Sequence, residues 1–210
     1  PFYNLQRIQK GESLGNFYMW RYAGHSADGE WLVYDKDGDI IRASQASDAD
    51  RQVVGNGMPK FTMSSSHNFR YKNFDLSLFF RGAFGYDIFN IHDFYYGTRN
   101  FTGNRLDKAY GKNFVVSGSA NPVVCDYFLE KGDYLKLDMM TLGYTLNLKD
   151  CPYLDRVRVY GTMKNIFTIT KFSGVDPSSY QVNGLTPGAQ GSRTYFPTTR
   201  QFIVGLQIDF

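Results

Sequence analysis

Residues 201–210 constrain the fold of this chain more narrowly than any other segment, because apolar and polar side chains alternate along them. Every second position is apolar, at Phe202, Val204, Leu206, Ile208 and Phe210, and most of the positions between them are not. Successive side chains of a β-strand point to opposite faces, so this spacing predicts a strand with one apolar face. Such a strand fits the wall of a membrane β-barrel or an edge of a soluble β-sandwich.

The composition favours an all-β fold and argues against nucleic acid as a partner. Aromatic residues make up 17% of the 210 residues, and 21 glycines are scattered along the chain. The 23 basic and 20 acidic residues interleave, so no basic stripe is available to bind nucleic acid. No apolar run approaches the roughly 18 residues of a membrane-spanning helix, but a barrel strand needs only about 10 residues, of which alternate ones face lipid.

Two alternating segments flank a predicted two-residue turn at 72–73. This turn would set Tyr71 opposite Phe74 on one face of a hairpin, and Arg70 opposite Asp75 on the other. Aromatic side chains at the turn end of one face and opposite charges on the other are typical of a membrane interface beside a polar barrel interior.

The segment 134–146 changes phase in its middle. Leu135 and Leu137 are apolar in one phase, and the apolar positions from Met140 onward follow the other. One extra residue near Asp138 would form a β-bulge and return all of these side chains to one face.

The next predicted strand carries three cations, at positions 156, 158 and 164, on the face opposite Val157 and Val159. Several charges in one row indicate a wet interior rather than a lipid-facing surface. The predicted lumen-facing polar residues are Arg70, Asp75, Arg156, Arg158 and Lys164.

The connections between the predicted strands are alternately short and long, as in outer-membrane barrels with tight periplasmic turns and large outer loops. The predicted strands cover about 60–71, 74–83, 134–146, 156–167 and 199–210. The predicted outer loops cover about 11–57, 84–133 and 168–197. The predicted fold class is therefore all-β: the C-terminal strands of a large antiparallel transmembrane β-barrel with long extracellular loops.

This topology separates the two cysteines. Cys125 ends an outer loop and Cys151 lies in a periplasmic turn. A disulfide needs Cα atoms within about 7 Å, whereas the apolar band of a barrel is about 25 Å tall, so no bridge between them is expected.

Aromatic side chains concentrate in the predicted loops, where they are candidate contacts for a ligand or partner. Aromatic faces stack on sugar rings, and Arg can hold carboxylates or carbonyl oxygens. Packing of one loop against another is the alternative for each residue. The candidates are Trp20, Tyr22, Trp31, Phe94, Tyr95, Tyr96 and Arg99.

An acidic turn offers a weak Ca²⁺ candidate. Asp35, Asp37 and Asp39 stand at the alternate spacing with which Ca²⁺ loops begin. The glycine and glutamate that an EF-hand requires further along are missing, because Ile40 and Ala46 occupy those positions. A plain Asp-Gly turn is the favoured interpretation, and we predict neither a metal nor another cofactor.

The histidines do not indicate catalysis. His25, His67 and His92 show no metal-ligand spacing and no nucleophile motif. Ser65 and His67 share one strand face, but the pattern supplies no third group to orient them. We therefore predict that the chain is not an enzyme.

Several segments resemble the SusC-like (RagA/SusC-type) TonB-dependent transporters of Bacteroidota, in the order in which that family has them. The matching stretches are GESLGNFYMWRYAG at 11–24, GNGMPKFTMS at 55–64, FRYKNFDLSLFFRGAFG at 69–85, FLEKGDYLKLDMMTLGY at 128–144, KNIFTITKFSGVDP at 164–177 and the final YFPTTRQFIVGLQIDF. Phe210 is similar to the terminal aromatic that serves outer-membrane barrels as an assembly signal.

The resemblance implies part of a barrel of about 22 strands in the outer membrane of a Gram-negative bacterium, with its plug domain outside this chain. It implies active import of glycans or peptides, energised by the TonB complex through the plug and capped by a SusD-like lipoprotein. Membrane lipid and the oligosaccharide or peptide substrate are the other implied partners. Two alternatives stay open: a soluble extracellular carbohydrate-binding β-sandwich and a passive porin-type barrel.

Overall fold

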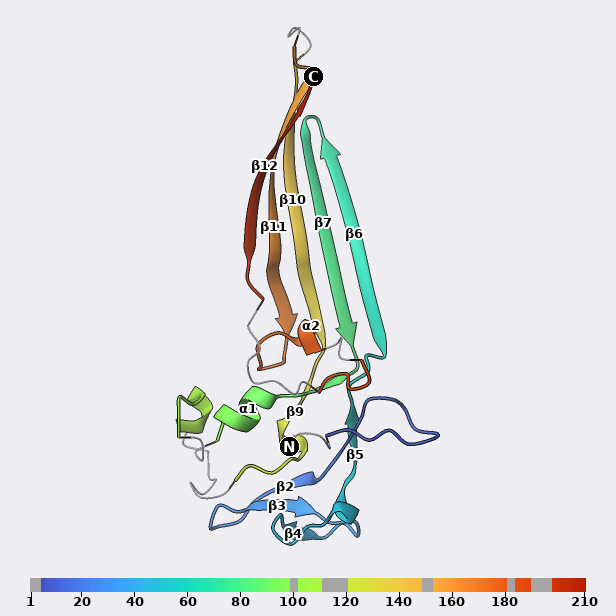
Figure 1. The fold of residues 1–210 in the computed structure, drawn as a ribbon, viewed down its shortest axis with the longest axis vertical. Coiled ribbons are helices and arrows are strands. Elements are labelled where there is room, and N and C mark those ends of the chain that lie inside the picture. Colours follow the sequence, from blue (N-terminus) through green and yellow to red (C-terminus); the bar gives the residue numbers. More distant parts are fainter. Residues whose placement is uncertain (1–4, 99–101, 111–120, 149–152, 181–183, 190–197) are drawn as a thin grey trace. The chain divides into compact units, whose positions relative to one another are not determined.

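The computed structural model describes residues 5–98, 102–110, 121–148, 153–180, 184–189 and 198–210 (Figure 1). Two predicted positions, Arg99 and Cys151, lie outside the described residues. The chain divides into two compact units. We call residues 61–84, 134–170 and 197–210 the sheet unit, and residues 1–60, 85–133 and 171–196 the loop unit.

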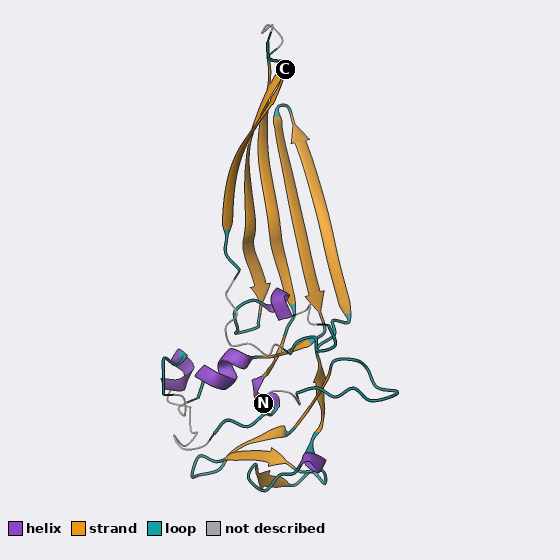
Figure 2. Ribbon diagram, viewed as in Figure 1, coloured by secondary structure: helices purple, strands orange, loops and turns teal. Residues whose placement is uncertain are grey.

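The fold class is all-β, as predicted. The strand pairs of both units are antiparallel, and the helical segments are short (Figure 2). The helical segments are η1 (Asp48–Asp50), α1 (Ile91–Tyr96), η2 (Asp107–Tyr110), η3 (Asp126–Phe128) and α2 (Pro177–Tyr180). Among the described residues, we find no helix that is long and apolar enough to cross a bilayer.

The sheet unit is one antiparallel sheet of five strands in the order β12-β11-β10-β7-β6, which lie side by side in Figure 1. The strands are β6 (Phe61–Tyr71), β7 (Phe74–Phe84), β10 (Tyr134–Asn147), β11 (Arg156–Thr170) and β12 (Gln201–Asp209). Some neighbours in the sheet are distant in the chain. The residues between β7 and β10, and most of those between β11 and β12, belong to the loop unit.

The register of the β6–β7 hairpin is the predicted one. Tyr71 pairs with Phe74 and Arg70 pairs with Asp75, so the turn consists of two residues. The first of these, Lys72, has a φ of +52°. This lies in the left-handed region, which residues other than Gly, Asn and Asp rarely adopt.

The predicted bulge is present in β10. The register shifts between Leu137 and Met139 against both neighbouring strands, and Asp138 is the residue at the shift. Its carboxylate forms an ion pair with Arg81 of β7, with 2.8 Å between Oδ2 and Nε. Opposite it in β11, Asn165 takes a φ of +52°, which Asn tolerates better than most residues. The bulge keeps both phases of β10 on one face of the sheet.

The sheet therefore has one apolar and one mainly polar face. Paired positions share a face, so the apolar face follows from the register of all five strands. It is uncovered: Val204 is 83% exposed and Phe202 is 70% exposed. Among its other members are Phe69, Phe74, Leu142, Tyr144, Val159, Phe167, Leu206 and Ile208.

The three chain segments predicted as outer loops supply most of the loop unit. Its strand pairs are short and enclose a shared aromatic core. The strands are β1 (Asn16–Met19) with β5 (Gln52–Asn56), then β2 (Arg21–His25), β3 (Trp31–Tyr34) and β4 (Ile40–Arg42) in one sheet, and β8 (Asp87–Phe89) with β9 (Leu129–Lys131). The core includes Phe17, Met19, Trp31, Phe89, Ile91, Phe94 and Phe128.

Phe128 joins the parts of this core, because its ring lies 5.0 Å from Phe94 and 5.5 Å from Trp31 between centroids. We expect Phe128→Ala to destabilise the loop unit by about 3–5 kcal/mol, the usual effect of deleting a buried aromatic ring. Amide hydrogen exchange of β3 and α1 measures this change. Ile8→Ala is the control, since Ile8 is 64% exposed in the same unit and its loss should change stability by less than about 0.5 kcal/mol. Equal exchange in the two variants would contradict the assignment of Phe128 to a cooperative core.

Candidate functional site

All five residues predicted to face a lumen lie on the polar face of the five-stranded sheet. Asp75 pairs with Arg70 on one side and with Gly143 on the other. Arg156, Arg158 and Lys164 alternate with the apolar residues of β11, so they lie on the same face as Asp75 and Arg70. Their partners in β10 and β12 are Asn147 and Asp209, Thr145 and Gln207, and Met139 and Gln201. The polar face is thus a continuous surface contributed by β6, β7, β10, β11 and β12.

An ion pair crosses this face from β7 to β11. The Asp75 carboxylate accepts two hydrogen bonds from Arg158, from Nε to Oδ1 at 3.0 Å and from Nη2 to Oδ2 at 2.6 Å. Paired, two-point contacts of this kind are the strongest between protein side chains. Both groups are about one quarter exposed.

Gly143 of β10 makes room for this ion pair. A Cβ atom there would lie 2.5 Å from Asp75 Oδ1 and 2.6 Å from Arg158 NH2. The missing side chain lets two residues separated by a whole strand meet directly. Gly205 of β12 plays the same part for Tyr160, whose ring would lie within 2.6 Å of a Cβ atom at that position.

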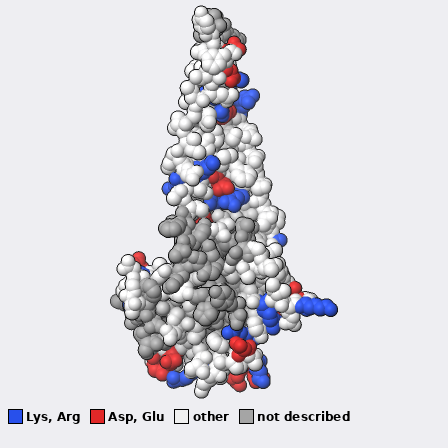
Figure 3. All heavy atoms as spheres, viewed as in Figure 1, with Lys and Arg blue, Asp and Glu red and all other residues white. Residues whose placement is uncertain are grey.

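The charged groups continue from Arg158 toward β12. The Arg158 guanidinium lies 4.9 Å from the centroid of the Tyr160 ring, a cation–π distance. Arg156 forms an ion pair with Asp209 of β12. On the face that Figure 3 draws, basic and acidic atoms lie next to one another within a mostly uncharged surface.

Near the β6–β7 turn, the polar face contains a hollow with a volume of about 400 Å³. Residues of all five strands line this hollow, together with the β6–β7 turn. The sequence pattern predicted its charges but not its shape, because the hollow forms only when residues of five strands are brought together in the sheet.

The aromatic candidates in the loop unit divide by burial. Trp31 is 2% exposed and Phe94 is 8% exposed, so both belong to the core, and a ligand cannot stack on their faces in this conformation. For these two residues, packing of one loop segment against another is the role that the structure shows. Trp20, Tyr22, Tyr95 and Tyr96 are half-buried. Trp20 donates from Nε1 to the carbonyl of Ser47 at 2.8 Å and lies 5.2 Å from the Arg51 guanidinium.

Tyr22 belongs to an aromatic cluster that includes His25 and Tyr127, neither of which the sequence pattern indicated as a contact. Its ring centroid lies 4.9 Å from Tyr127 and 5.9 Å from Trp31. The Tyr22 hydroxyl and His25 Nδ1 are 2.8 Å apart. Burial raises the pKa of Tyr22 to about 12 and lowers the pKa of His25, so both groups are uncharged at neutral pH.

Asp93 lies beside the candidates Phe94 to Tyr96 as a buried carboxylate. It is 3% exposed and forms an ion pair with Lys108, while its Oδ1 has no hydrogen-bond partner. Burial raises the pKa of Asp93, and the Lys108 ammonium opposes that shift. Asn90 caps α1 by accepting from the Asp93 backbone N–H at 3.1 Å.

The acidic turn has the geometry of an Asp-Gly turn. Asp35 Oδ1 accepts hydrogen bonds from the backbone N–H groups of Asp37 and Asp39 at 2.9 and 2.8 Å, and Gly38 has a φ of +93°. Within the described ranges, no group of three His, Cys, Asp or Glu side chains is placed to hold a metal ion.

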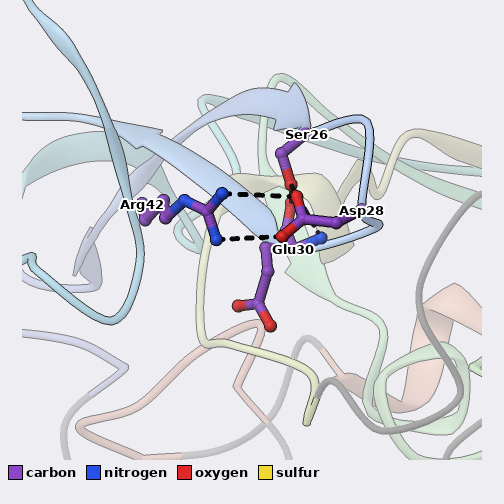
Figure 4. Close-up of polar contacts among 4 residues, drawn as sticks. All are labelled: Ser26, Asp28, Glu30 and Arg42. Atoms are coloured by element: carbon purple, nitrogen blue, oxygen red, sulfur yellow. Dashed lines mark hydrogen bonds and ion pairs between the residues drawn. The ribbon is translucent and has the colours of Figure 1, made fainter.

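A neighbouring acidic residue is held by a cation in the same small sheet. Arg42 of β4 donates to both carboxylate oxygens of Asp28, at 3.0 and 3.4 Å, as Figure 4 shows. Ser26 also donates to Asp28, and the Glu30 backbone N–H donates to Ser26. These contacts tie the β2–β3 turn to β4 and leave the Asp28 carboxylate engaged.

Ser65 and His67 form a polar pair on the apolar face, with 2.9 Å between Oγ and Nε2. The other neighbours of the His67 ring are the aromatic rings of Phe69 and Phe80. In the described part of the chain, no third group orients this pair. Cys125 is buried in the loop unit, and its predicted separation from Cys151 stays a prediction because Cys151 lies outside the described residues.

Comparisons with known proteins connect these features to one group. No family model matches the chain. TonB-dependent receptor P3 of Formosa agariphila is 28% identical to all of this chain, over 24% of its own length. TonB-dependent receptor SusC of Bacteroides thetaiotaomicron is 24% identical to 98% of the chain, over 20% of its own length. The chain thus spans about a quarter of these relatives or less.

Solved structures share the fold. The RagAB peptide transporter superposes with a TM-score of 0.73 at 23% identity, over 93% of this chain and 23% of that one. The RagAB peptide importer in its 'open-open' state gives the same TM-score at 23% identity. These relatives are named as receptors, transporters and importers, and none is named as an enzyme.

The role of Gly143 can be tested by adding a single methyl group. Gly143→Ala would force the Asp75–Arg158 ion pair apart, and we expect it to lower the free energy of unfolding by about 1–3 kcal/mol, as overpacking does elsewhere. Gly161→Ala is the matched control. Gly161 pairs with Leu142, the residue that precedes Gly143 in β10, and a Cβ atom at Gly161 would meet nothing within 4 Å. Denaturant unfolding of the full-length protein measures both. Equal stability of the two variants would show that the crossing ion pair does not depend on Gly143.

Proposed function

We propose, from the premise that this chain is a segment of a SusC-like TonB-dependent transporter, that the sheet unit is part of the wall of an outer-membrane β-barrel. The transporter actively imports peptides or glycans, is energised by TonB through a plug domain outside this chain, and is capped by a SusD-like lipoprotein. The segment carries no enzymatic step and uses no cofactor.

The observation that carries this proposal is the uncovered apolar face of the five-stranded sheet. Apolar side chains as exposed as Val204, at 83%, cost free energy in water. In a barrel wall they face lipid, while Arg158 and its neighbours face a wet interior. A soluble β-sandwich would need a second sheet over the apolar face, and none of the described strands outside this sheet belongs to a sheet of more than three strands.

The connections support the same orientation. The β6–β7 turn has two residues, whereas the segments between β7 and β10 and between β11 and β12 are long and join strand ends at the opposite end of the sheet. Outer-membrane barrels have this asymmetry, with their long loops on the outer side. The loop unit is then the extracellular part of this segment.

The loop unit supplies the proposed contacts with substrate or lipoprotein. Trp20, Tyr22, Tyr95 and Tyr96 keep part of their rings exposed, and Arg99 stays a predicted contact outside the described residues. The RagAB structures are of a peptide importer, and both peptides and glycans stay candidates for the imported class.

Uptake by cells tests the transport function. Cells that express the full-length transporter and its lipoprotein should accumulate a fluorescent oligopeptide, and accumulation should stop when TonB is deleted or when a protonophore collapses the proton gradient. A labelled oligosaccharide is the parallel substrate. Accumulation that continues without TonB would assign a passive pore instead, and accumulation of neither substrate would contradict the importer.

Insertion into the membrane can be tested at two adjacent residues of β12. Val204 lies on the apolar face and Ile203, 41% exposed, on the polar face. Val204→Arg should destabilise the inserted barrel by up to about 2–4 kcal/mol, because a cation would face lipid. Ile203→Arg places the same charge in the wet interior and should leave insertion unchanged. Heat-modifiable migration of the protein from outer-membrane fractions reports folding. The reverse order of effects would assign the polar face to the lipid.

A further inference from the structure

Three segments of the loop unit that are far apart in the chain meet at the carboxylate of Glu130. Asn90 follows β8, Glu130 lies in β9, and Ser173 lies in the segment after β11. Glu130 Oε1 accepts hydrogen bonds from Asn90 Nδ2 at 2.8 Å and from Ser173 Oγ at 2.7 Å. Glu130 Oε2 accepts one from the Ser173 backbone N–H, also at 2.7 Å. We call these three residues the Glu130 junction.

Only uncharged donors hold the Glu130 carboxylate. Among the described residues, no Lys, Arg or His forms an ion pair with it. Hydrogen bonds to a charged acceptor are about twice as strong as those between neutral groups, and they weaken steeply when the donor is misaligned. The junction therefore fixes the orientation of its members as well as their proximity.

Asn90 extends this orientation to α1. Its side chain is 2% exposed, and its Oδ1 accepts from the Asp93 N–H, in the first turn of α1, at 3.1 Å. Because Glu130 holds the Nδ2 end of the same amide, α1 cannot turn relative to Glu130 without loss of a hydrogen bond. The half-buried Tyr95 and Tyr96 lie in the last turn of this helix.

We propose that Glu130 is a positioning residue for transport. It holds Asn90 against Ser173, and so orients α1 and the tyrosines that α1 carries relative to residues 171–176. The inference rests on the proposed function, in which Tyr95 and Tyr96 contact substrate or lipoprotein. Glu130 acts through these residues and touches neither partner, so its loss should weaken binding without slowing the steps of transport that follow.

The change Glu130→Gln tests the junction at constant side-chain size. Either orientation of the new amide would set its NH2 group against a donor, the Ser173 N–H or Asn90 Nδ2. The swap variant combines Glu130→Gln with Asn90→Asp and restores every partner. Its new amide can donate to the new carboxylate and accept from the Ser173 N–H, and the new carboxylate can still accept from the Asp93 N–H.

Glu30→Gln is the matched control in the same unit. Glu30 is half-buried, and its carboxylate makes no hydrogen bond or ion pair with the other residues drawn in Figure 4. This change removes the same charge from a glutamate that joins no segments, so it should leave transport and local exchange unchanged.

Uptake by cells and amide hydrogen exchange of the full-length transporter are measured for each variant. Glu130→Gln should raise severalfold the concentration of fluorescent oligopeptide or labelled oligosaccharide that gives half-maximal uptake, with the maximal rate unchanged, because binding alone is weakened. Exchange should rise in α1 and stay unchanged in β3, which a general loss of stability would also affect. The swap variant should restore both the half-maximal concentration and the protection of α1.

Four results would overturn the proposal: an unchanged half-maximal concentration in Glu130→Gln, unchanged exchange of α1, an equal rise of exchange in β3, or no recovery in the swap variant. Wild-type uptake separates these results from a failure of the proposed function. If the wild type accumulates neither substrate, or does so without TonB, the proposed function is wrong and this inference falls with it. If wild-type uptake depends on TonB and Glu130→Gln behaves as Glu30→Gln does, this inference alone is wrong.

Discussion

Period-two alternation of side chains is the constraint on which the rest of this structure depends. A sheet with one lipid-facing and one water-facing surface tolerates no slip of one residue, because a slip turns every side chain of a strand to the wrong side. The bulge at Asp138 keeps the apolar residues of β10 on one face of the sheet. In β11, beside this bulge, Asn165 adopts a left-handed backbone conformation. Without that paired irregularity, the apolar residues on one side of the bulge would lie among the charges of the polar face.

One ion pair on the polar face skips a strand. Asp75 of β7 and Arg158 of β11 meet across β10 because Gly143 has no side chain there. Removing one partner of such a pair would leave a charge in a partly desolvated place, so these contacts fix the relative position of strands that do not hydrogen-bond to each other.

The short-range features of the fold could be read from the sequence, and the long-range ones could not. The hairpin register followed from a two-residue turn, and the bulge followed from the phase change between Leu137 and Met140, because both are local patterns. The strand-skipping role of Gly143 depends on residues that are brought together only by the sheet. In the loop unit, aromatic content indicated a binding surface, but pairing of distant segments buried Trp31 and Phe94 in a core instead. A single sequence carries no signal for such pairing between loops.

Spin labels along β12 can show whether the apolar face of the sheet contacts lipid. Single cysteines at positions 202 to 208 of the full-length transporter, each spin-labelled in reconstituted bilayers, can be compared for collisions with oxygen, which concentrates in lipid, and with a water-soluble nickel complex. We expect alternation with a period of two: labels at 202, 204, 206 and 208 should favour oxygen, and labels at 203, 205 and 207 should favour nickel. Uniform access along the strand, or alternation in the opposite phase, would contradict it.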